Sequence, residues 1–162
     1  MADLRVGTAF DAHRLVAGRP LVLGGVLIQH PSGLEGHSDA DIVCHVLCDA
    51  ALGAAALGDI GRLFPGTLEW RDAASIDLLA RAFAQVAAAG WQLVNADCMV
   101  VLQAPKIAPH VDEMRERVAV AMRTTPDRVS IRGTTTDGLG FPGRGEGAAA
   151  QAVVLLERSK AD

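Results

Sequence analysis

Apolar residues recur at helical spacing in the segment that begins near residue 39. Ser38, followed three residues later by Asp41, resembles a capping box, which marks the start of a helix. The apolar positions beyond it fall mostly three and four residues apart, as on the buried face of a helix. They are Ile42, Val43, Val46, Leu47, Ala50, Ala51, Ala54 and Leu57. The pattern predicts a helix over roughly 39–57.

The same spacing indicates two further helices. One begins with Ser75 as its cap residue and stops at Gly90, a residue type that commonly ends helices. The other covers about 109–122, with apolar residues on one side. Each is expected to pack that side against a core.

Extended segments alternate with these helices. An opening strand begins near Leu4 and stops at the polar residues around His13. The next extended segment, 20–28, is broken by Gly24 and Gly25, which suggest a bulge. Further strands are predicted at 91–103, 128–134 and 150–156, and loops rich in breakers at 29–36, 58–66 and 133–147.

This order of elements predicts an α/β fold with two layers. Helices that alternate with strands favour a mixed β-sheet with the helices packed on one face, a two-layer α+β sandwich. The chain has 162 residues, close to the usual size of one domain, and shows no internal repeat. We therefore expect one domain over residues 1–162.

Composition excludes several classes of partner. Fifteen Lys and Arg against nineteen Asp and Glu give a formal charge of −4, without a basic stripe, so nucleic acid is not the expected partner. No apolar run approaches the roughly 18 residues that span a bilayer, and the first residues lack a signal-peptide core. We expect a cytoplasmic protein without a membrane partner. Cys44, Cys48 and Cys98 lack zinc-finger spacing and are expected to be reduced thiols in the core.

Three side chains form a candidate metal site. Asp11 and His13 are two residues apart in an extended segment, so both can face one ion. His45 lies on the polar side of the first predicted helix, together with Asp41 and Asp49. Two imidazoles and one carboxylate suit a zinc ion with a fourth position open for substrate. On the motif alone, capping, hydrogen-bonding and surface roles stay open for the same residues.

Two further segments have the chemistry to bind an anion. His37 and Ser38 precede the first helix, where free backbone N–H groups favour negative charge, although Ser38 could equally cap that helix. Thr134–Thr136 and Asp137 stand in a glycine-rich loop whose amides can approach phosphate oxygens. That loop contains a formal dinucleotide fingerprint, which we reject because a strand follows it rather than a helix. No Walker A motif occurs. Asp59 could cap a turn or contact substrate hydroxyls.

Several motifs in order resemble the 2-C-methyl-D-erythritol 2,4-cyclodiphosphate synthase family over about residues 5–156. The motifs are Phe10-Asp11-Ala12-His13, His37-Ser38-Asp39-Ala40-Asp41, Ala54-Ala55-Ala56-Leu57-Gly58-Asp59-Ile60-Gly61, Ala104-Pro105-Lys106, Thr134-Thr135-Thr136 and Gly143-Arg144-Gly145-Glu146-Gly147. The resemblance implies an enzyme of the non-mevalonate isoprenoid pathway. Its substrate, 4-diphosphocytidyl-2-C-methyl-D-erythritol 2-phosphate, would cyclise by attack of the 2-phosphate on the β-phosphorus, with release of CMP.

The resemblance also implies roles for individual residues. Asp11, His13 and His45 would hold zinc, with Asp11 and His13 also next to the substrate, and His37 and Thr135 would stabilise the transition state. The remaining substrate-binding positions would be Ser38 on phosphate, Asp59 and Gly61 beside the erythritol, Ala104, Pro105, Lys106, Ile107, Ala108, Thr134, Thr135 and Thr136 around the cytidine, and Phe64, Asp137, Phe141 and Arg144.

Members of the family are homotrimers in which neighbouring subunits share each active site, and a second divalent ion, magnesium or manganese, bridges the diphosphate. Asp137 stands at the position expected to meet that ion, where the family usually has Glu. The loop Gly66–Arg71 lacks the two aspartates usual in the family. Two alternatives share the same residues: a metal-dependent phosphohydrolase that uses water as the nucleophile, and a trimeric binding module without turnover.

Overall fold

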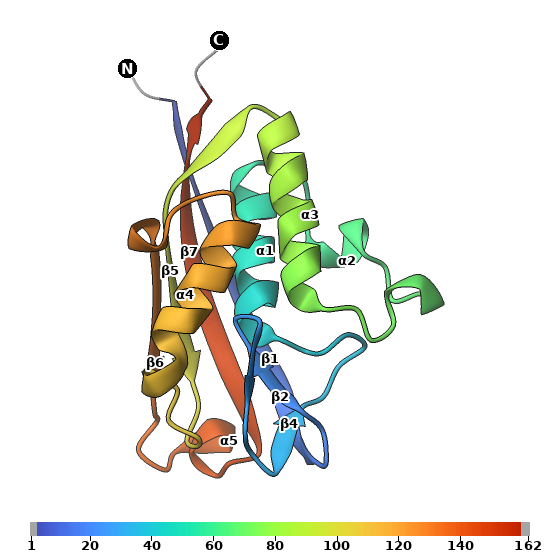
Figure 1. Cartoon of the computed structure of the whole chain (residues 1–162), viewed down its shortest axis with the longest axis vertical. Coiled ribbons are helices and arrows are strands. Elements are labelled where there is room, and N and C mark those ends of the chain that lie inside the picture. The colour runs from blue at the N-terminus through green and yellow to red at the C-terminus, as the bar shows by residue number, and fades with distance from the viewer. Residues whose placement is uncertain (1–2, 160–162) are drawn as a thin grey trace.

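A mixed five-stranded β-sheet with helices on one face organises the chain in a computed structural model that describes residues 3–159 (Figure 1). The strand order is β4-β1-β7-β5-β6. Only the β5–β6 pair is parallel. The five strands are β1 (Leu4–Ala17), β4 (Ser32–Leu34), β5 (Trp91–Val101), β6 (Val129–Thr134) and β7 (Gly147–Arg158). The predicted two-layer arrangement with a mixed sheet is confirmed.

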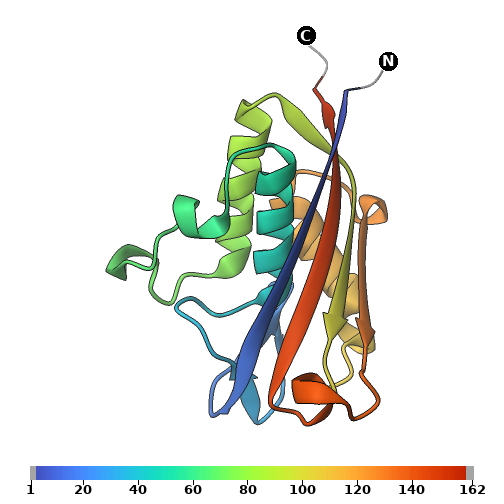
Figure 2. The ribbon, with the colours of Figure 1, turned by 180° about the vertical axis from the view of Figure 1, so that it is seen from behind.

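Three longer helices cover one face of this sheet. They are α1 (Ile42–Ala54), α3 (Ser75–Ala88) and α4 (Val111–Ala121). Four short helical turns join the larger elements: α2 (Ile60–Leu63), η1 (Leu68–Trp70), η2 (Ala108–His110) and η3 (Pro126–Arg128). A fifth, α5 (Gly140–Gly143), lies in the glycine-rich loop before β7. Seen from behind, the opposite face of the strands has no long helix over it within residues 3–159 (Figure 2).

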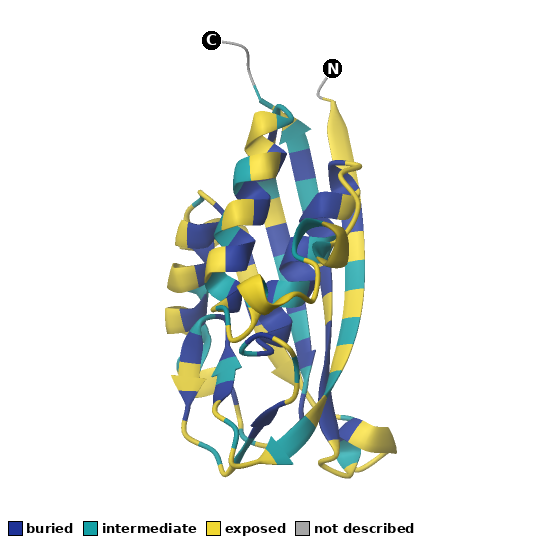
Figure 3. Cartoon of the chain, turned by 90° about the vertical axis from the view of Figure 1, so that its right-hand side faces the viewer, coloured by how far each residue is buried: buried dark blue, intermediate teal, exposed yellow. Residues whose placement is uncertain are grey.

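The two faces of the sheet differ because side chains alternate along each strand. On β7 the positions that face the helices are fully buried, and on α3 the buried residues form a band along one side (Figure 3). Helix α1 is buried around most of its surface. The uncovered face is exposed and only partly apolar: Val6 is 69% and Phe10 is 67% accessible, and the Asp97–Arg132 ion pair lies on the same face. The helix-facing residues belong to one continuous hydrophobic core.

Helix α1 lies unusually close to β1. A Cβ atom added at Gly7 would lie 1.9 Å from the carbonyl oxygen of Ala50, so no other residue fits there without moving the helix. On the neighbouring strand β7 the residues facing the helices near the same level are small, Ala148, Ala150 and Ala152, all with no accessible surface. Small residues on the strands therefore bring the helix backbone down onto the sheet.

Asp41, rather than Ser38, caps helix α1. Its side chain accepts hydrogen bonds from the backbone N–H groups of Val43 and Cys44, and the helix begins at Ile42 and ends at Ala54, inside the predicted range. The predicted polar position of Asp41 beside His45 is wrong, because Asp41 is fully buried. Its second function is to hold the turn of the hairpin formed by β2 (Leu21–Leu23) and β3 (Val26–Ile28). The Gly24 and Gly25 N–H groups of this turn donate to it at 2.9 and 2.6 Å.

The structure corrects several other boundaries. Strand β1 does not stop near His13; it continues to Ala17, because β7 and then β4 supply hydrogen-bond partners. Gly24 and Gly25 form a tight turn between β2 (Leu21–Leu23) and β3 (Val26–Ile28), not a bulge, and both have positive φ. Ser75 is the first residue of α3 rather than its cap, and its N–H donates to Asp39. The predicted loops 29–36, 58–66 and 133–147 contain β4, α2 and α5, and β7 is longer than predicted at both ends.

Asp41→Ala should lower the free energy of unfolding by about 3 kcal/mol, since it removes a helix cap and leaves buried N–H groups without acceptors. The loss is limited by the cost of burying the carboxylate, which raises the pKa of Asp41. Urea unfolding at one fixed protein concentration measures the change. Asp112→Ala on the surface of α4 is the control, because the Asp112 side chain is 94% exposed. A loss below about 0.5 kcal/mol would be that of an ordinary surface substitution and would contradict this role of Asp41.

Candidate functional site

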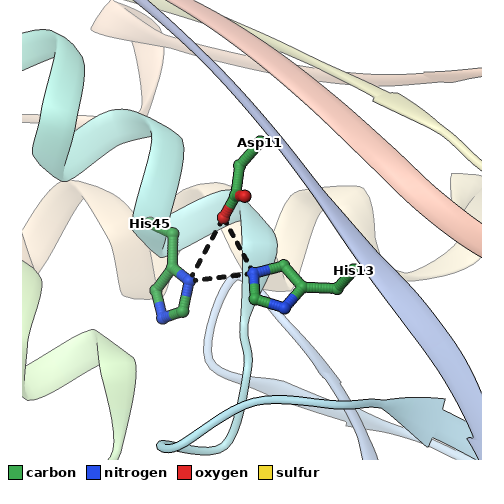
Figure 4. Close-up of side chains that lie close together, drawn as sticks. All are labelled: Asp11, His13 and His45. Carbon is green, nitrogen blue, oxygen red and sulfur yellow. Dashed lines mark hydrogen bonds and ion pairs between the residues drawn. The ribbon is translucent and has the colours of Figure 1, made fainter. Parts of the chain in front are cut away.

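Asp11, His13 and His45 converge on one point between β1 and α1 (Figure 4). Asp11 and His13 alternate with Ala12 along β1, so both point toward the helix layer. His45, in the first turns of α1, faces them. The His13 Nε2 atom lies 2.8 Å from Asp11 Oδ2 and 3.3 Å from His45 Nδ1, and the latter is 3.5 Å from Asp11 Oδ2. The structure thus brings together the three predicted metal ligands.

Hydrogen bonds on the far side of each imidazole orient its ligand atom. The His13 Nδ1 atom lies 2.6 Å from the carbonyl oxygen of Glu35, which can only accept, so Nδ1 donates and Nε2 is left to face the cluster. The His45 Nε2 atom lies 3.1 Å from Ser75 Oγ and 3.2 Å from Ser38 Oγ. Ser75 in turn donates to the Asp39 carboxylate. Such outer partners fix the tautomer and orientation of metal-binding histidines.

The electrostatics of the cluster favour a cation. Burial alone would raise the pKa of Asp11, but hydrogen bonds from His13 and His45 and the charge of His13 outweigh it, so the pKa of Asp11 lies well below its usual value. The hydrogen bond to Asp11 raises the pKa of His13 despite the opposing effect of burial. A carboxylate that stays ionised between two imidazoles is a strong point of attraction for a positive charge.

The donor set fits a divalent metal ion. Ligand atoms about 2.0–2.2 Å from a tetrahedral ion lie roughly 3.3–3.6 Å apart. The three observed separations, 2.8, 3.3 and 3.5 Å, approach that range without an ion to define them. Among residues 3–159 no other group of three His, Cys, Asp or Glu side chains meets in this way. All three cysteines are buried free thiols, as predicted, and contribute nothing to the cluster.

A cavity of about 250 Å³ opens beside the cluster. Predicted site residues His37, Ser38, Gly61 and Phe64 line it together with His13 and His45. Sequence reasoning missed its apolar wall, formed by Ile60, Trp70 and Leu78, with Gly66 at the edge. Trp70 contacts Phe64 edge-on, with ring centroids 5.0 Å apart. The sequence signal that could have identified this wall was an aromatic residue, Trp70, just after the glycine-containing loop 58–66.

Two predicted residues at this cavity also have structural roles. The His37 Nε2 atom lies 2.8 Å from the carbonyl oxygen of Thr67, which ties its ring to the segment in front of the cavity. Asp59 is exposed and caps α2, where its carboxylate accepts from the Arg62 N–H at 2.8 Å. It is not among the residues that line the cavity, so of its two predicted roles the structure supports the cap directly.

A second cavity, of about 320 Å³, lies at the ends of β5 and β6. The predicted residues Pro105, Lys106, Ile107, Ala108, Thr134 and Thr135 line it, together with Val100, Leu102, Gln103 and Gly133. Gly133 is needed there, because a Cβ atom would lie 2.9 Å from Ile107 Cγ1. Most of its lining is apolar, with the hydroxyl-bearing residues Thr134 and Thr135 also present, a composition suited to a flat base.

The remaining predicted residues lie outside both cavities. Ala104, Thr136 and Asp137 stand beside the second cavity in sequence but do not line it. Asp137 is exposed, with positive φ, and its Oδ1 lies 3.4 Å from Thr135 Oγ1. Phe141 lines a smaller hollow with His13 and Arg14, and Arg144 pairs with Glu146 at 2.7 Å.

The two cavities lie at the same end of the sheet but beside different strands. Val100 and Gly133 of the second cavity are level with Asp11 and face the helices as it does. Thr134 pairs with Val101, Val101 with Ala149, and Ala149 with Ala12. Because residues level across a sheet point the same way, Thr134 and Ala12 face the uncovered side, whereas the metal ligands flanking Ala12 face the helices. With neighbouring strands about 4.8 Å apart, roughly 14 Å separates β6 from β1. One chain therefore holds the two groups apart.

Comparisons with known proteins agree over nearly the whole chain. Residues 4–157 match the YgbB family. A protein of Moorella thermoacetica named 2-C-methyl-D-erythritol 2,4-cyclodiphosphate synthase is 54% identical over 94% of each chain. A solved structure of a synthase of the same name, in a CDP-bound form, is 41% identical with a TM-score of 0.85 and covers 94% of this chain and 99% of its own.

A third relative is a longer protein. The structure of the bifunctional IspDF of Campylobacter jejuni matches 98% of this chain with a TM-score of 0.93 and 40% identity, but only 43% of the longer chain. No helix within residues 3–159 is long and apolar enough to cross a bilayer. On the agreement of family, sequence and structure, the chain belongs to the YgbB family of 2-C-methyl-D-erythritol 2,4-cyclodiphosphate synthases.

Proposed function

We propose that this chain is a zinc-dependent, homotrimeric 2-C-methyl-D-erythritol 2,4-cyclodiphosphate synthase. The reaction is attack of the 2-phosphate of 4-diphosphocytidyl-2-C-methyl-D-erythritol 2-phosphate on the β-phosphorus of its diphosphate, with CMP as the leaving group. The observation that carries the proposal is the presence, in one chain of this family, of a metal-ligand cluster and a base-sized cavity at the same end of the sheet.

Zinc is the ion that the ligand set suits best. Asp11, His13 and His45 supply one oxygen and two nitrogen donors, the composition of catalytic zinc sites that keep one position open. When bound there, zinc supplies a Lewis acid for phosphate oxygens. Ser38 is the proposed phosphate contact, because its hydroxyl lies in the cavity wall next to His45.

The cavity at the ends of β5 and β6 is the proposed cytidine pocket. A relative 41% identical to this chain has a CDP-bound form, which supports a cytidine nucleotide as the ligand. Residues 104–108 would offer backbone groups to the base edge, and the hydroxyls of Thr134, Thr135 and Thr136 would meet the phosphates. Lys106, on the cavity wall, has a charge suited to the same phosphates.

The separation of the two groups supports a site shared between subunits, as in the homotrimer we propose. The proposed transition-state contacts, His37 and Thr135, must approach one phosphorus, yet they lie by strands about 14 Å apart. A second subunit can bring its threonine run to the metal cluster of the first. The exposed, partly apolar face with Val6 and Phe10 is the proposed contact surface.

Within a shared site the protein mainly positions charge. The nucleophile is already part of the substrate, so catalysis reduces to aligning the 2-phosphate with the β-phosphorus and stabilising spreading negative charge. His37 and Thr135 would donate to the phosphoryl oxygens, while Asp59, Gly61 and Phe64 would hold the erythritol. Phe141 and Arg144 would contact the substrate at the interface between subunits.

Asp137 is the proposed contact for a second ion, magnesium or manganese, between the phosphates. Its exposed carboxylate stands next to Thr135 and suits such a hard cation. We also propose a cytoplasmic setting, which the three free, buried thiols support.

Incubating the metal-loaded protein with the diphosphocytidyl substrate should yield CMP and a cyclic diphosphate. Phosphorus NMR identifies the second product, and chelation of the metal should abolish both. A linear phosphate would instead indicate the phosphohydrolase, and unchanged substrate the binding module.

His45→Ala should lose zinc and activity together, because it removes one of three ligands and leaves the site with two. Metal content by mass spectrometry and CMP release are measured on the same preparation. Asp112→Ala, on the surface of α4, should keep both. An inactive His45→Ala protein with one zinc per subunit would overturn the ligand assignment.

Thr135→Ala should keep its zinc but lose turnover by about 100-fold, the effect of removing one transition-state donor. Co-expression of Thr135→Ala with His45→Ala chains in equal amounts should then restore up to about a quarter of wild-type activity, since that share of interfaces in a cyclic trimer pairs an intact cluster with an intact threonine run. No recovery in verified mixed trimers would mean that each site lies within one chain.

A further inference from the structure

Asp49 has no role in the reaction as described so far, yet it connects the metal cluster to the neighbouring cavity. It lies four residues after His45 on α1, so both side chains leave the same face of one buried helix. Its Oδ1 atom accepts a hydrogen bond of 2.6 Å from the backbone N–H of Ile60. Ile60 is the first residue of α2, the turn that follows Asp59 and contains Gly61.

The turn α2 packs only partly against the core, through Ile60 and Leu63. It contains four residues, none of them buried, and helices this short are not stable by themselves. Asp59 caps it from inside through the Arg62 N–H, which orders the turn but does not attach it to the rest of the fold. The bond from Ile60 to Asp49 adds a polar attachment to this partial packing, and it ends on the same helix that carries His45.

The carboxylate stays in this place against an electrostatic cost. Burial raises the pKa of Asp49, and the negative charges of Asp59 and Asp11 raise it further. A neutral acceptor would avoid the repulsion, but a carboxylate forms the stronger hydrogen bond to a backbone N–H. A need to anchor α2 firmly would explain why a carboxylate stands at position 49 despite this electrostatic cost.

We propose that Asp49 is a positioning residue that fixes α2, and with it Asp59 and Gly61, at a set distance from the metal ligand His45. The inference rests on the proposed function, in which Asp59 and Gly61 hold the erythritol part of the substrate. Asp49 itself touches neither metal nor substrate. Because His45 and Asp49 both belong to α1, this helix would set the separation between the phosphate at the metal and the erythritol.

Asp49→Ala should raise KM about tenfold, the effect of losing one charged hydrogen bond in a binding element, and leave kcat within about twofold. Zinc content should not change. Asp49→Asn keeps an acceptor oxygen and should stay within about threefold of the wild-type KM, while Asp112→Ala on α4 controls for loss of an exposed acid. Alanine is well tolerated in helices, so Asp49→Ala is expected to fold.

Hydrogen exchange of the Ile60 amide tests the anchor without any substrate. Exchange should accelerate in Asp49→Ala and stay slow in Asp49→Asn. If the wild-type protein formed no cyclic product, the proposed function would fail, and this comparison would still decide whether the anchor exists.

A double-mutant cycle gives the sharpest test. Ile60→Pro removes the N–H donor, and proline suits the first position of a helix after an extended residue such as Asp59. In that background Asp49→Ala should have no further effect on KM. Additive effects, an unchanged KM in Asp49→Ala, equal losses in the Asn and Ala variants, or loss of zinc in Asp49→Ala would each overturn the proposal.

Discussion

The close packing of α1 on β1 is the constraint on which the rest of the site depends. His45 reaches Asp11 and His13 only because Gly7 and the small residues of β7 let the helix backbone lie almost on the strands. Asp41 sets where that helix begins, since its buried carboxylate serves both the first turn of α1 and the hairpin turn at Gly24 and Gly25. A shift of α1 by one residue would rotate His45 away from the strand. Sheet packing and metal chemistry are therefore set by the same few contacts.

The sequence predicted much of this fold because its strongest signals are local. Period and spacing identified α1, α3 and α4, and the two-residue spacing of Asp11 and His13 placed both on one face of a strand. The predictions were wrong where residues far away in the sequence determine a cap or a strand boundary. Asp41 and Ser38 both look like cap residues, and only the buried hairpin N–H groups favour Asp41. Likewise the length of β1 depends on the pairing partners β7 and β4, which no local pattern shows.

The candidate site was predictable in the same uneven way. Its polar residues stand in recognisable motifs, whereas the apolar wall of Ile60, Trp70 and Leu78 comes from three separate segments with ordinary composition. Outer contacts such as Glu35 to His13 and Ser75 to His45 were also missed, because they cross 22 and 30 residues of chain. The sheet keeps the candidate metal ligands on β1 and the threonine run after β6 several strands apart, so a single chain presents two incomplete surfaces. Under the proposed function, assembly and catalysis would depend on each other.

The placement of the two tryptophans gives the protein an optical reporter. Trp91 is almost fully buried, stacked between the guanidinium groups of Arg5 and Arg158 at 4.4 and 4.0 Å. Trp70 instead lines the cavity beside the metal cluster and contacts Phe64 and Arg81. The chain contains no tyrosine, so ultraviolet emission comes from these two indoles alone. Replacing Trp91 by Phe would leave one indole, Trp70, whose emission wavelength and quenching report on the cavity beside the candidate metal site.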